Sequence, residues 1–239
     1  MDLYWLEQSE ADVPKEDNWL STGEVICLSG MHFSKRRIDW RLGRWTAKRA
    51  LAACLHLAHR PSTLAEIEVR AAPSGAPEVF IGNQPAAFAV SISHRAGLGV
   101  CAVARTHVDL GCDLETIEPR GQAFVTDYFT TQEQALIAQA SAPDQPRLLA
   151  LLWSGKESAL KALHVGLRLD TRSVVVSPGD ISFHLGGWHP LEVRWADAQV
   201  FHGWWRHADG FLRTVVATPP PSLPTFLSVA DRIGATAYP

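Results

Sequence analysis

Two short segments of the chain, about forty residues apart, carry acidic side chains at spacings that suit a shared site. The first is Gly111-Cys112-Asp113-Leu114-Glu115, which ends a run of strict alternation between apolar and other residues that begins at Val108. Side chains of a β-strand alternate between its two faces. Asp113 and Glu115 are therefore predicted to point the same way, out of a buried sheet. Asp109 shares this face, and we expect it to be structural.

The second segment runs from Trp153 to Lys161 and has helical spacing. Its two faces differ: Trp153, Glu157, Lys161 and His164 lie on one, and Leu148, Leu152, Ala159 and Leu163 lie on the other. If this helix neighbours the strand, three carboxylates and a lysine converge. Hard cations such as Mg²⁺ prefer carboxylates together with phosphate oxygens, which suits a pyrophosphate substrate. The alternative is a solvated strand face beside a surface Glu157–Lys161 ion pair, worth about 0.3–0.5 kcal/mol.

Together the two segments match every fixed position of G-x-D-x-E followed by W-x-x-K-E-x-x-x-K. In this order they resemble the 4′-phosphopantetheinyl transferases, and most of all the single-chain, broad-specificity Sfp-type. A lone G-x-D-x-E is a weak signal, whereas the second motif is much more specific. The resemblance covers roughly residues 28–217 and extends to three further segments: Ser91-Ile92-Ser93-His94, Phe129-Thr130-Thr131-Gln132-Glu133 and Val165-Gly166-Leu167.

The resemblance implies an α+β fold of two similar halves, with helices packed on small antiparallel sheets. A pseudo-twofold axis would relate the halves, and the active site would lie in the cleft between them. We expect an N-terminal half over residues 1–106, a C-terminal half with the metal and catalytic motifs over 107–218, and a Pro-rich tail over 219–239. One repeat in the sequence fits this division, because four residues recur at an offset of 108: Trp45, Lys48, Leu55 and His56 as Trp153, Lys156, Leu163 and His164.

The resemblance also implies roles for individual residues. The carboxylates of Asp113, Glu115 and Glu157 would hold Mg²⁺, or Mn²⁺, on the pyrophosphate of coenzyme A. Glu157 would also act as the general base, and Lys161 would offset charge on the phosphate and the leaving group.

Other residues are expected to bind coenzyme A itself. His94 would contact its 3′-phosphate, with Ser93 and Arg95 beside it. Lys156 would extend its charged end toward the cleft, although a packed stem with a solvated head is the more ordinary use of such a lysine. His164 has no role that the resemblance supplies.

A basic segment, residues 35–49, contains a stripe at helical spacing formed by Arg37, Arg41, Arg44 and Lys48. Such a stripe is usually a solvated face. The resemblance assigns basic residues of this region to the phosphates of coenzyme A, and Arg44 is the best candidate. The sequence departs from the family at Gly75-Ala76-Pro77, where many members have lysine in the middle position.

Composition argues against several other classes of protein. The 239 residues are 46% hydrophobic and carry a net charge of −3, which argues against a nucleic-acid partner. The four cysteines show no C-x-x-C spacing, so a zinc site or a disulfide framework is not expected. The sequence shows no signal-peptide pattern and no apolar run long enough to span a membrane. We expect a cytoplasmic monomer.

The sequence therefore predicts an enzyme that transfers the 4′-phosphopantetheine arm of coenzyme A to a serine of an apo acyl or peptidyl carrier protein. The reaction would depend on Mg²⁺ and release adenosine 3′,5′-bisphosphate. Two alternatives stay open. One is a metal-dependent hydrolase or transferase acting on another diphosphate, and the other is a non-catalytic module that binds carrier proteins.

Local patterns predict the elements that position these residues. Helices are expected over 34–59, 130–140 and about 146–166, each with a capping residue or proline at its start. Strands are expected at 67–69, 79–81, 99–104, 173–176, 181–185, 191–195, 199–205 and 212–217. The Pro219-Pro220-Pro221 run then breaks the pattern, and residues 222–239 are expected to form an appended tail.

Overall fold

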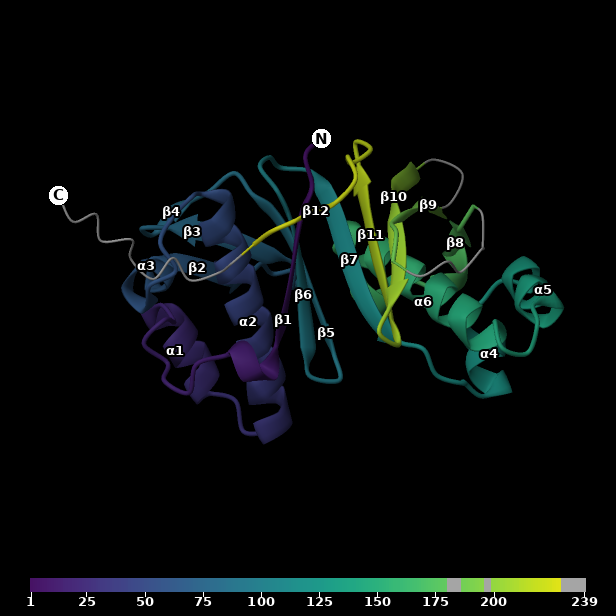
Figure 1. Cartoon of the computed structure of the whole chain (residues 1–239), viewed down its shortest axis with the longest axis horizontal. Helices are drawn as coiled ribbons and strands as arrows, with labels where there is room; N and C mark the ends of the chain where they lie inside the picture. The colour runs from purple at the N-terminus through teal and green to yellow at the C-terminus, as the bar shows by residue number, and fades with distance from the viewer. Residues whose placement is uncertain (180–185, 196–198, 229–239) are drawn as a thin grey trace.

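Three β-sheets and the helices packed on them form the mixed α+β fold of this chain, seen in Figure 1 as two lobes side by side. The computed structural model describes residues 1–179, 186–195 and 199–228. The first sheet has the strand order β12-β1-β6-β5, the second β7-β11-β10-β9-β8, and the third β2-β3-β4. Apart from the parallel pair β1–β12, the described strand pairs are antiparallel.

The strands are β1 (Tyr4–Ser9), β2 (Ile67–Ala71), β3 (Pro77–Ile81), β4 (Gln84–Pro85), β5 (Ala89–Arg95), β6 (Leu98–Ala104), β7 (Asp109–Thr116), β8 (Val174–Ser177), β9 (His189–Trp195), β10 (Gln199–Ala208), β11 (Phe211–Thr218) and β12 (Thr225–Phe226). The helices are α1 (Thr22–Ser29), α2 (Ser34–Cys54), α3 (Pro61–Ala65), α4 (Gln122–Tyr128), α5 (Thr131–Gln139) and α6 (Gln145–Ala162), with short 3₁₀ turns η1 (Glu10–Asp12), η2 (Gly166–Arg168) and η3 (Thr171–Ser173). The predicted strand at 181–185 lies outside the described residues.

Each lobe contains one long helix, which packs on one of the larger sheets. Helix α2 lies against β1, β5 and β6, and α6 lies against β7 and β11. Thr130 caps α5 and Pro146 lies in the first turn of α6, as predicted. Helix α2 lacks the predicted cap, because Phe33 is its N-cap residue and Ser34 is already helical. Both long helices end earlier than predicted, because His56 and His164 adopt left-handed φ angles of 56° and 57° and end the helices there.

The basic stripe of α2 is not the solvated face that its pattern indicates. The guanidinium of Arg37 donates to the carbonyls of Leu28 and Met31, and that of Arg41 donates to carbonyls of the 14–16 segment. Charged donors on this face therefore form hydrogen bonds with backbone carbonyl groups of the N-terminal loops. Such carbonyl groups need hydrogen-bond partners when they are buried.

The same set of contacts occurs once in each lobe. In the first, Ser21 and Glu24 form a capping box, the buried ammonium of Lys48 binds Glu24, and Glu24 also accepts from the N–H of Val69 on β2. In the second, Thr130, Glu133, Lys156 and Val176 on β8 repeat these contacts. The offset of 108 seen in the sequence thus marks two lysines in equivalent surroundings.

The two larger sheets share a core where the lobes meet. Strand β5 lies against β7, and an apolar cluster combines residues of β1 and β6 with residues of β7 and β11. Across this junction, the buried guanidinium of Arg213 on β11 makes a two-point ion pair with Glu7 on β1, at 2.6 and 2.8 Å. Such a paired fork adds geometric specificity as well as energy.

The segment after Thr218 does not behave as the predicted appended tail within its described part. Strand β12 extends the first sheet by pairing with β1, and backbone N–H groups of Ser222, Thr225 and Leu227 donate to carbonyls of residues 1–5 at 2.8–2.9 Å. Leu227 packs on the core of the first lobe. The prolines follow the end of β11, as expected. The chain after them pairs with the edge of β1.

Ending the chain at Thr218 should therefore lower the melting temperature relative to a chain that ends at Ser228. The shorter chain loses three backbone hydrogen bonds, each worth roughly 0.5–1.5 kcal/mol net, and the packing of Leu227. For a chain of this size 1 kcal/mol corresponds to about 2–4 °C, so the expected difference is about 5 °C or more by differential scanning calorimetry. Equal melting temperatures for the two truncations would show that β12 contributes nothing to stability.

Candidate functional site

A close approach between α6 and β7 builds the site. Gly111 of β7 faces the helix backbone, and a Cβ at this position would lie 1.8 Å from the carbonyl oxygen of Ser158. Only glycine permits this contact. The residues on either side of the contact are Asp113 and Glu115 on the strand, and Glu157 and Lys161 on the helix, so the two motifs of the sequence meet as predicted.

Lys161 and Asp113 form the centre of the site. The Lys161 ammonium donates to Asp113 Oδ1 at 2.8 Å and to the carbonyl of Cys112 at 3.0 Å. Burial alone would lower the pKa of Lys161, but the Asp113 carboxylate outweighs it and the net shift is upward. The lysine is therefore charged, and its side chain remains 29% exposed for a further anionic partner.

Glu115 is held by donors from three directions. Trp153 Nε1 donates to Oε1 at 3.2 Å, and the guanidinium of Arg120 donates to Oε2 at 3.2 Å. Arg95 Nε lies 3.5 Å from the same oxygen. Burial and then the Asp113 charge raise the pKa of Glu115, and the two arginines counteract them. The sequence did not single out Trp153 as a donor or Arg120 at all, because neither role is visible from its spacing.

Glu157 has the most altered acidity at this site. Burial raises its pKa to about 7, and the charges of Asp113 and Glu115 add to this while Lys161 opposes it. A carboxyl with a pKa near 7 is suited to accept a proton at neutral pH. Asp113 and Glu115 therefore lie near enough to Glu157 for their charges to raise its pKa.

These residues fit a divalent cation. Oδ2 of Asp113 is buried and lacks a hydrogen-bond partner, which is costly for an ionised oxygen unless an ion or a donor binds there. Asp113, Glu115 and Glu157 supply only oxygen donors, as Mg²⁺ and Mn²⁺ prefer. Among the described residues no group of three His, Cys, Asp or Glu side chains is already arranged as a metal cluster. The metal assignment stays a prediction.

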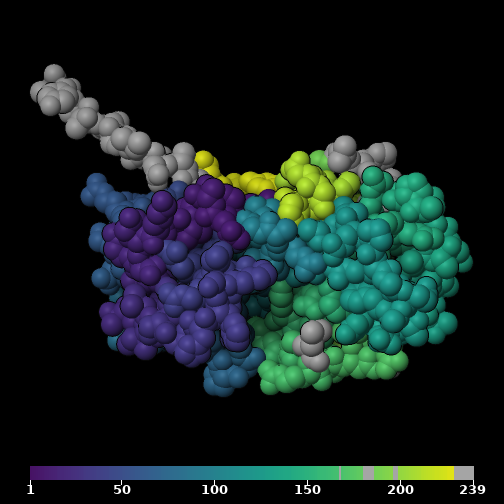
Figure 2. Space-filling model, turned by 90° about the horizontal axis from the view of Figure 1, so that it is seen from below, coloured from purple at the N-terminus to yellow at the C-terminus, as the bar shows by residue number. Residues whose placement is uncertain are grey.

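A cavity of about 290 Å³ lies beside this centre, between the lobes. Its lining includes Lys161, Arg44, His164 and the loop that contains Gly75-Ala76-Pro77. A neighbouring cavity of about 580 Å³ shares Ser74, Ala76 and His164 with it. Figure 2 shows a hollow where the purple and blue first lobe faces the green second lobe. The position where the sequence departs from the family, Ala76, therefore borders both cavities.

Arg44 is the member of the basic stripe that reaches the cavity. Its guanidinium lies 4.9 Å from the ring centre of Trp40 and 3.9 Å from the Glu24 carboxylate, and its buried Nε has no hydrogen-bond partner. The Arg44 side chain borders the cavity, and a guanidinium in this position favours an anionic ligand. The choice of Arg44 among the arginines stays a prediction.

His94 and Arg95 lie at the end of β5. The side chain of His94 is 42% exposed and its Nδ1 lies 4.0 Å from the carboxylate of Asp39. Burial lowers the pKa of His94, with Asp39 opposing and Lys161 reinforcing the shift. Arg95 turns toward the second lobe and donates to Glu118 at 3.0 Å, so in this structure it serves carboxylates and not an open phosphate position.

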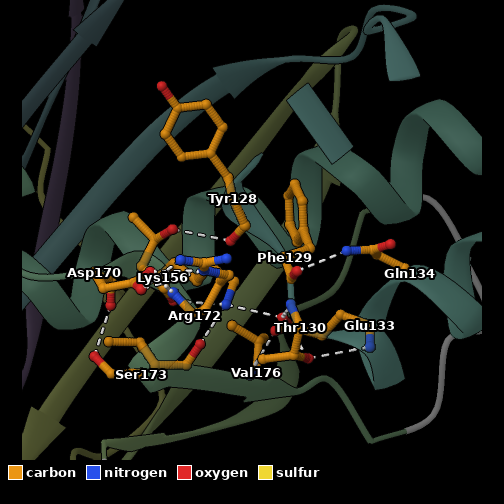
Figure 3. A network of polar contacts seen from close by, with 12 residues as sticks. Tyr128, Phe129, Thr130, Glu133, Gln134, Lys156, Asp170, Arg172, Ser173 and Val176 are labelled. Carbon is orange, nitrogen blue, oxygen red and sulfur yellow. Dashed lines mark hydrogen bonds and ion pairs between the residues drawn. The ribbon is translucent and has the colours of Figure 1, made fainter. Parts of the chain in front are cut away.

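Lys156 does not reach the site, contrary to its predicted contact with coenzyme A. Its side chain is fully buried, with the ammonium 2.9 Å from Glu133 and donating to the carbonyls of Thr171 and Val174, as Figure 3 shows for the pair with Glu133. The reason is the direction of the side chain: it leaves α6 on the face that packs against α5 and β8. Lys156 joins elements within the second lobe.

Comparison with known proteins finds a family model that matches part of the chain. Residues 109–218 match the family model described as the 4′-phosphopantetheinyl transferase superfamily. This match covers the second lobe and less than half of the chain. Among solved structures, the chain is similar to the Helicobacter pylori holo-[acyl-carrier-protein] synthase in complex with coenzyme A, with 19% identity, 43% of this chain and 97% of that chain covered, and a TM-score of 0.34. No curated protein matches the chain.

The matched domain contains Asp113, Glu115, Glu157 and Lys161, whereas Arg44, Ser93 and His94 precede it. No helix among the described residues is both long and apolar enough to cross a membrane.

Replacing Lys156 by methionine should destabilise the protein by about 3–5 kcal/mol, because Glu133 would remain buried without its cation. Urea denaturation measures this change. Lys35→Met is the matched control, since Lys35 is exposed in a surface pair with Asp39 and such changes usually stay within about 0.5 kcal/mol. A Lys156→Met protein as stable as the wild type would contradict the structural role.

Glu157 should make the metal-free protein less stable as pH rises from about 4.5 to about 7. Its folded pKa of about 7 lies above the ordinary value, so the folded state binds the proton more tightly, and this stabilisation is lost as the pH passes through the folded value. The difference in unfolding free energy between wild type and Glu157→Gln, measured with chelator between pH 4.5 and 8, should shift toward the variant as pH rises. A difference that does not vary with pH would show that folding does not raise the pKa of Glu157.

Proposed function

We propose that this protein is a 4′-phosphopantetheinyl transferase of the single-chain, Sfp-type kind. Its substrates would be coenzyme A and an apo acyl or peptidyl carrier protein. The observation that carries the proposal is the meeting of Lys161, Asp113 and Glu157 at the edge of a cavity lined by a second cation, Arg44. The superfamily match of the second lobe supports the same reaction class.

Phosphoryl-type transfer depends mainly on positioning and on offsetting charge. The carrier serine hydroxyl would attack the β-phosphorus of coenzyme A, and the bond from this phosphorus to the oxygen that bridges the two phosphates would break. Adenosine 3′,5′-bisphosphate would leave. A divalent cation held by Asp113, Glu115 and Glu157 would neutralise charge on the pyrophosphate.

The chain's own groups do the rest of the chemistry. Glu157, whose pKa burial raises to about 7, is suited to take the proton from the serine hydroxyl. The Lys161 ammonium keeps its charge beside Asp113 and would stabilise negative charge on the phosphate oxygens or supply a proton to the leaving group. Arg44 would hold a phosphate in the cavity beside the first lobe.

We also infer that the two lobes are similar halves related by a pseudo-twofold axis, with only the second carrying the acidic motifs. The duplicated capping boxes and buried Lys–Glu pairs support this relation. The ends of α2 and α6 support it as well, since a histidine with a left-handed φ ends each helix. A single chain would then contain both sides of its own cleft, which fits a monomer.

The deciding experiment mixes the protein with coenzyme A, Mg²⁺ and apo carrier proteins, and weighs the carriers by mass spectrometry. A mass increase equal to one phosphopantetheine arm is expected, and Asp113→Asn and Glu157→Gln should each abolish it while circular dichroism stays unchanged. Chelator should abolish it reversibly. Hydrolysis of coenzyme A without a modified carrier would favour the diphosphate hydrolase, and carrier binding without either reaction would favour the non-catalytic module.

His94→Ala should weaken binding of coenzyme A by about 1.5–3 kcal/mol, the worth of a hydrogen bond to a charged group. If the 3′-phosphate contact is equal in the ground and transition states, the effect falls on KM. 3′-Dephospho-coenzyme A lacks this phosphate, so the variant should discriminate less between the two coenzymes. The measurement is the ratio of the two KM values in wild type and variant; an unchanged ratio would make His94 structural.

A further inference from the structure

Ser93 makes a hydrogen bond to Asp113 that the sequence did not predict. It lies on β5 in the first lobe, only 7% exposed, and its Oγ donates a 2.9 Å hydrogen bond to Oδ1 of Asp113 on β7. The same oxygen accepts the ammonium of Lys161 at 2.8 Å. Asp113 itself is 5% exposed, so this bond is made away from water.

The two donors leave the other oxygen of Asp113 free. Oδ2 is buried and has no hydrogen-bond partner, although a buried carboxylate oxygen ordinarily has one. Because Ser93 and Lys161 approach Oδ1 from different elements, they fix the rotation of the carboxyl group. Fixed in this way, the group presents a single unoccupied oxygen.

This arrangement has the form of an outer hydrogen bond that orients a metal ligand. Partners of this kind hold a ligating group in one orientation, and their loss typically costs 10- to 100-fold in metal affinity or activity. The family resemblance of the sequence instead implies that Ser93 is among the residues that bind coenzyme A. In this structure its hydroxyl hydrogen is already committed to Asp113, so that role would require the bond to break.

We propose that Ser93 is a positioning residue, which turns the Asp113 carboxyl so that Oδ2 faces a divalent cation. This inference rests on the proposed function and refines it. It makes the geometry of the metal ligand depend on the first lobe, because Ser93 belongs to β5 while Asp113 and Lys161 belong to the second lobe.

The chain offers a matched control two residues earlier on the same strand. Ser91 is also buried and also contacts β7, but its Oγ accepts from the backbone N–H of Cys112 at 2.8 Å and touches no carboxylate. Ser91→Ala and Ser93→Ala therefore remove the same hydroxyl group from equally buried positions on one face. Ser93→Thr keeps a hydroxyl at the second position.

The experiment measures Mn²⁺ binding to the full chain by electron paramagnetic resonance, without and with coenzyme A. Ser93→Ala should raise the Kd for Mn²⁺ by about 10-fold or more, whereas Ser91→Ala and Ser93→Thr should stay within about 3-fold of wild type. A second readout is the ratio of KM values for coenzyme A and 3′-dephospho-coenzyme A. A positioning role leaves this ratio unchanged in Ser93→Ala, and raises the Mg²⁺ concentration that half-activates transfer.

Each other outcome overturns the proposal in a distinct way. Wild-type Mn²⁺ affinity in Ser93→Ala would show that Asp113 is oriented without the serine. A KM ratio that falls toward one would make Ser93 a contact of the 3′-phosphate. An equal loss of Mn²⁺ affinity in Ser91→Ala would show that any disturbance of the packing between β5 and β7 weakens binding. Absence of Mn²⁺ binding by the wild type, with transfer intact, would remove the metal site and this role with it, while leaving the proposed transferase standing.

Discussion

The contact between Gly111 and the backbone of α6 is the constraint on which the site depends. With a Cβ position 1.8 Å from the Ser158 carbonyl, any other residue would force the helix away from β7. Glu157 directly precedes Ser158 in α6, and Lys161 follows one turn later, so the same movement would separate them from Asp113. The glycine of G-x-D-x-E is thus as necessary to the chemistry as the acids, although it carries no functional group.

Burial has the largest effect on the ionisation of two carboxylates at the site. Lys161, Arg95 and Arg120 face the three carboxylates, yet the pKa values of Glu115 and Glu157 are still raised, above all by burial. Neighbouring carboxylates raise one another's pKa in the same direction. A bound cation would lower both values and thereby ionise the group proposed to accept the serine proton. Burial of these carboxylates thus couples binding of a cation at the site to the ionisation of Glu157.

The sequence revealed the parts of this arrangement that lie within one element. Alternation identified β7, and helical spacing placed Glu157 and Lys161 on one face of α6. Prediction from the sequence failed where the position of a side chain or strand depends on a partner far away in the chain. Lys156 was predicted to face the cleft, but α5 places its partner Glu133 inside the second lobe. Arg37 and Arg41 were predicted to be solvated, but they bind carbonyl groups of the N-terminal loops. Strand β12 was missed for the same reason, because its partner β1 lies at the other end of the chain.

The motif residues all lie in the second lobe, but the geometry of the site does not. The first lobe contributes the Ser93 hydrogen bond to Asp113, Arg44 at the cavity and His94 at the end of β5. The lobes are joined through an apolar cluster and through the buried pair of Arg213 with Glu7. Because a hydrogen bond tolerates only a few tenths of an ångström, a small rotation between the lobes would release Ser93 from Asp113. The shared core therefore acts on the site directly, because it fixes β5 against β7 and with it the hydrogen bond that orients the Asp113 carboxyl group.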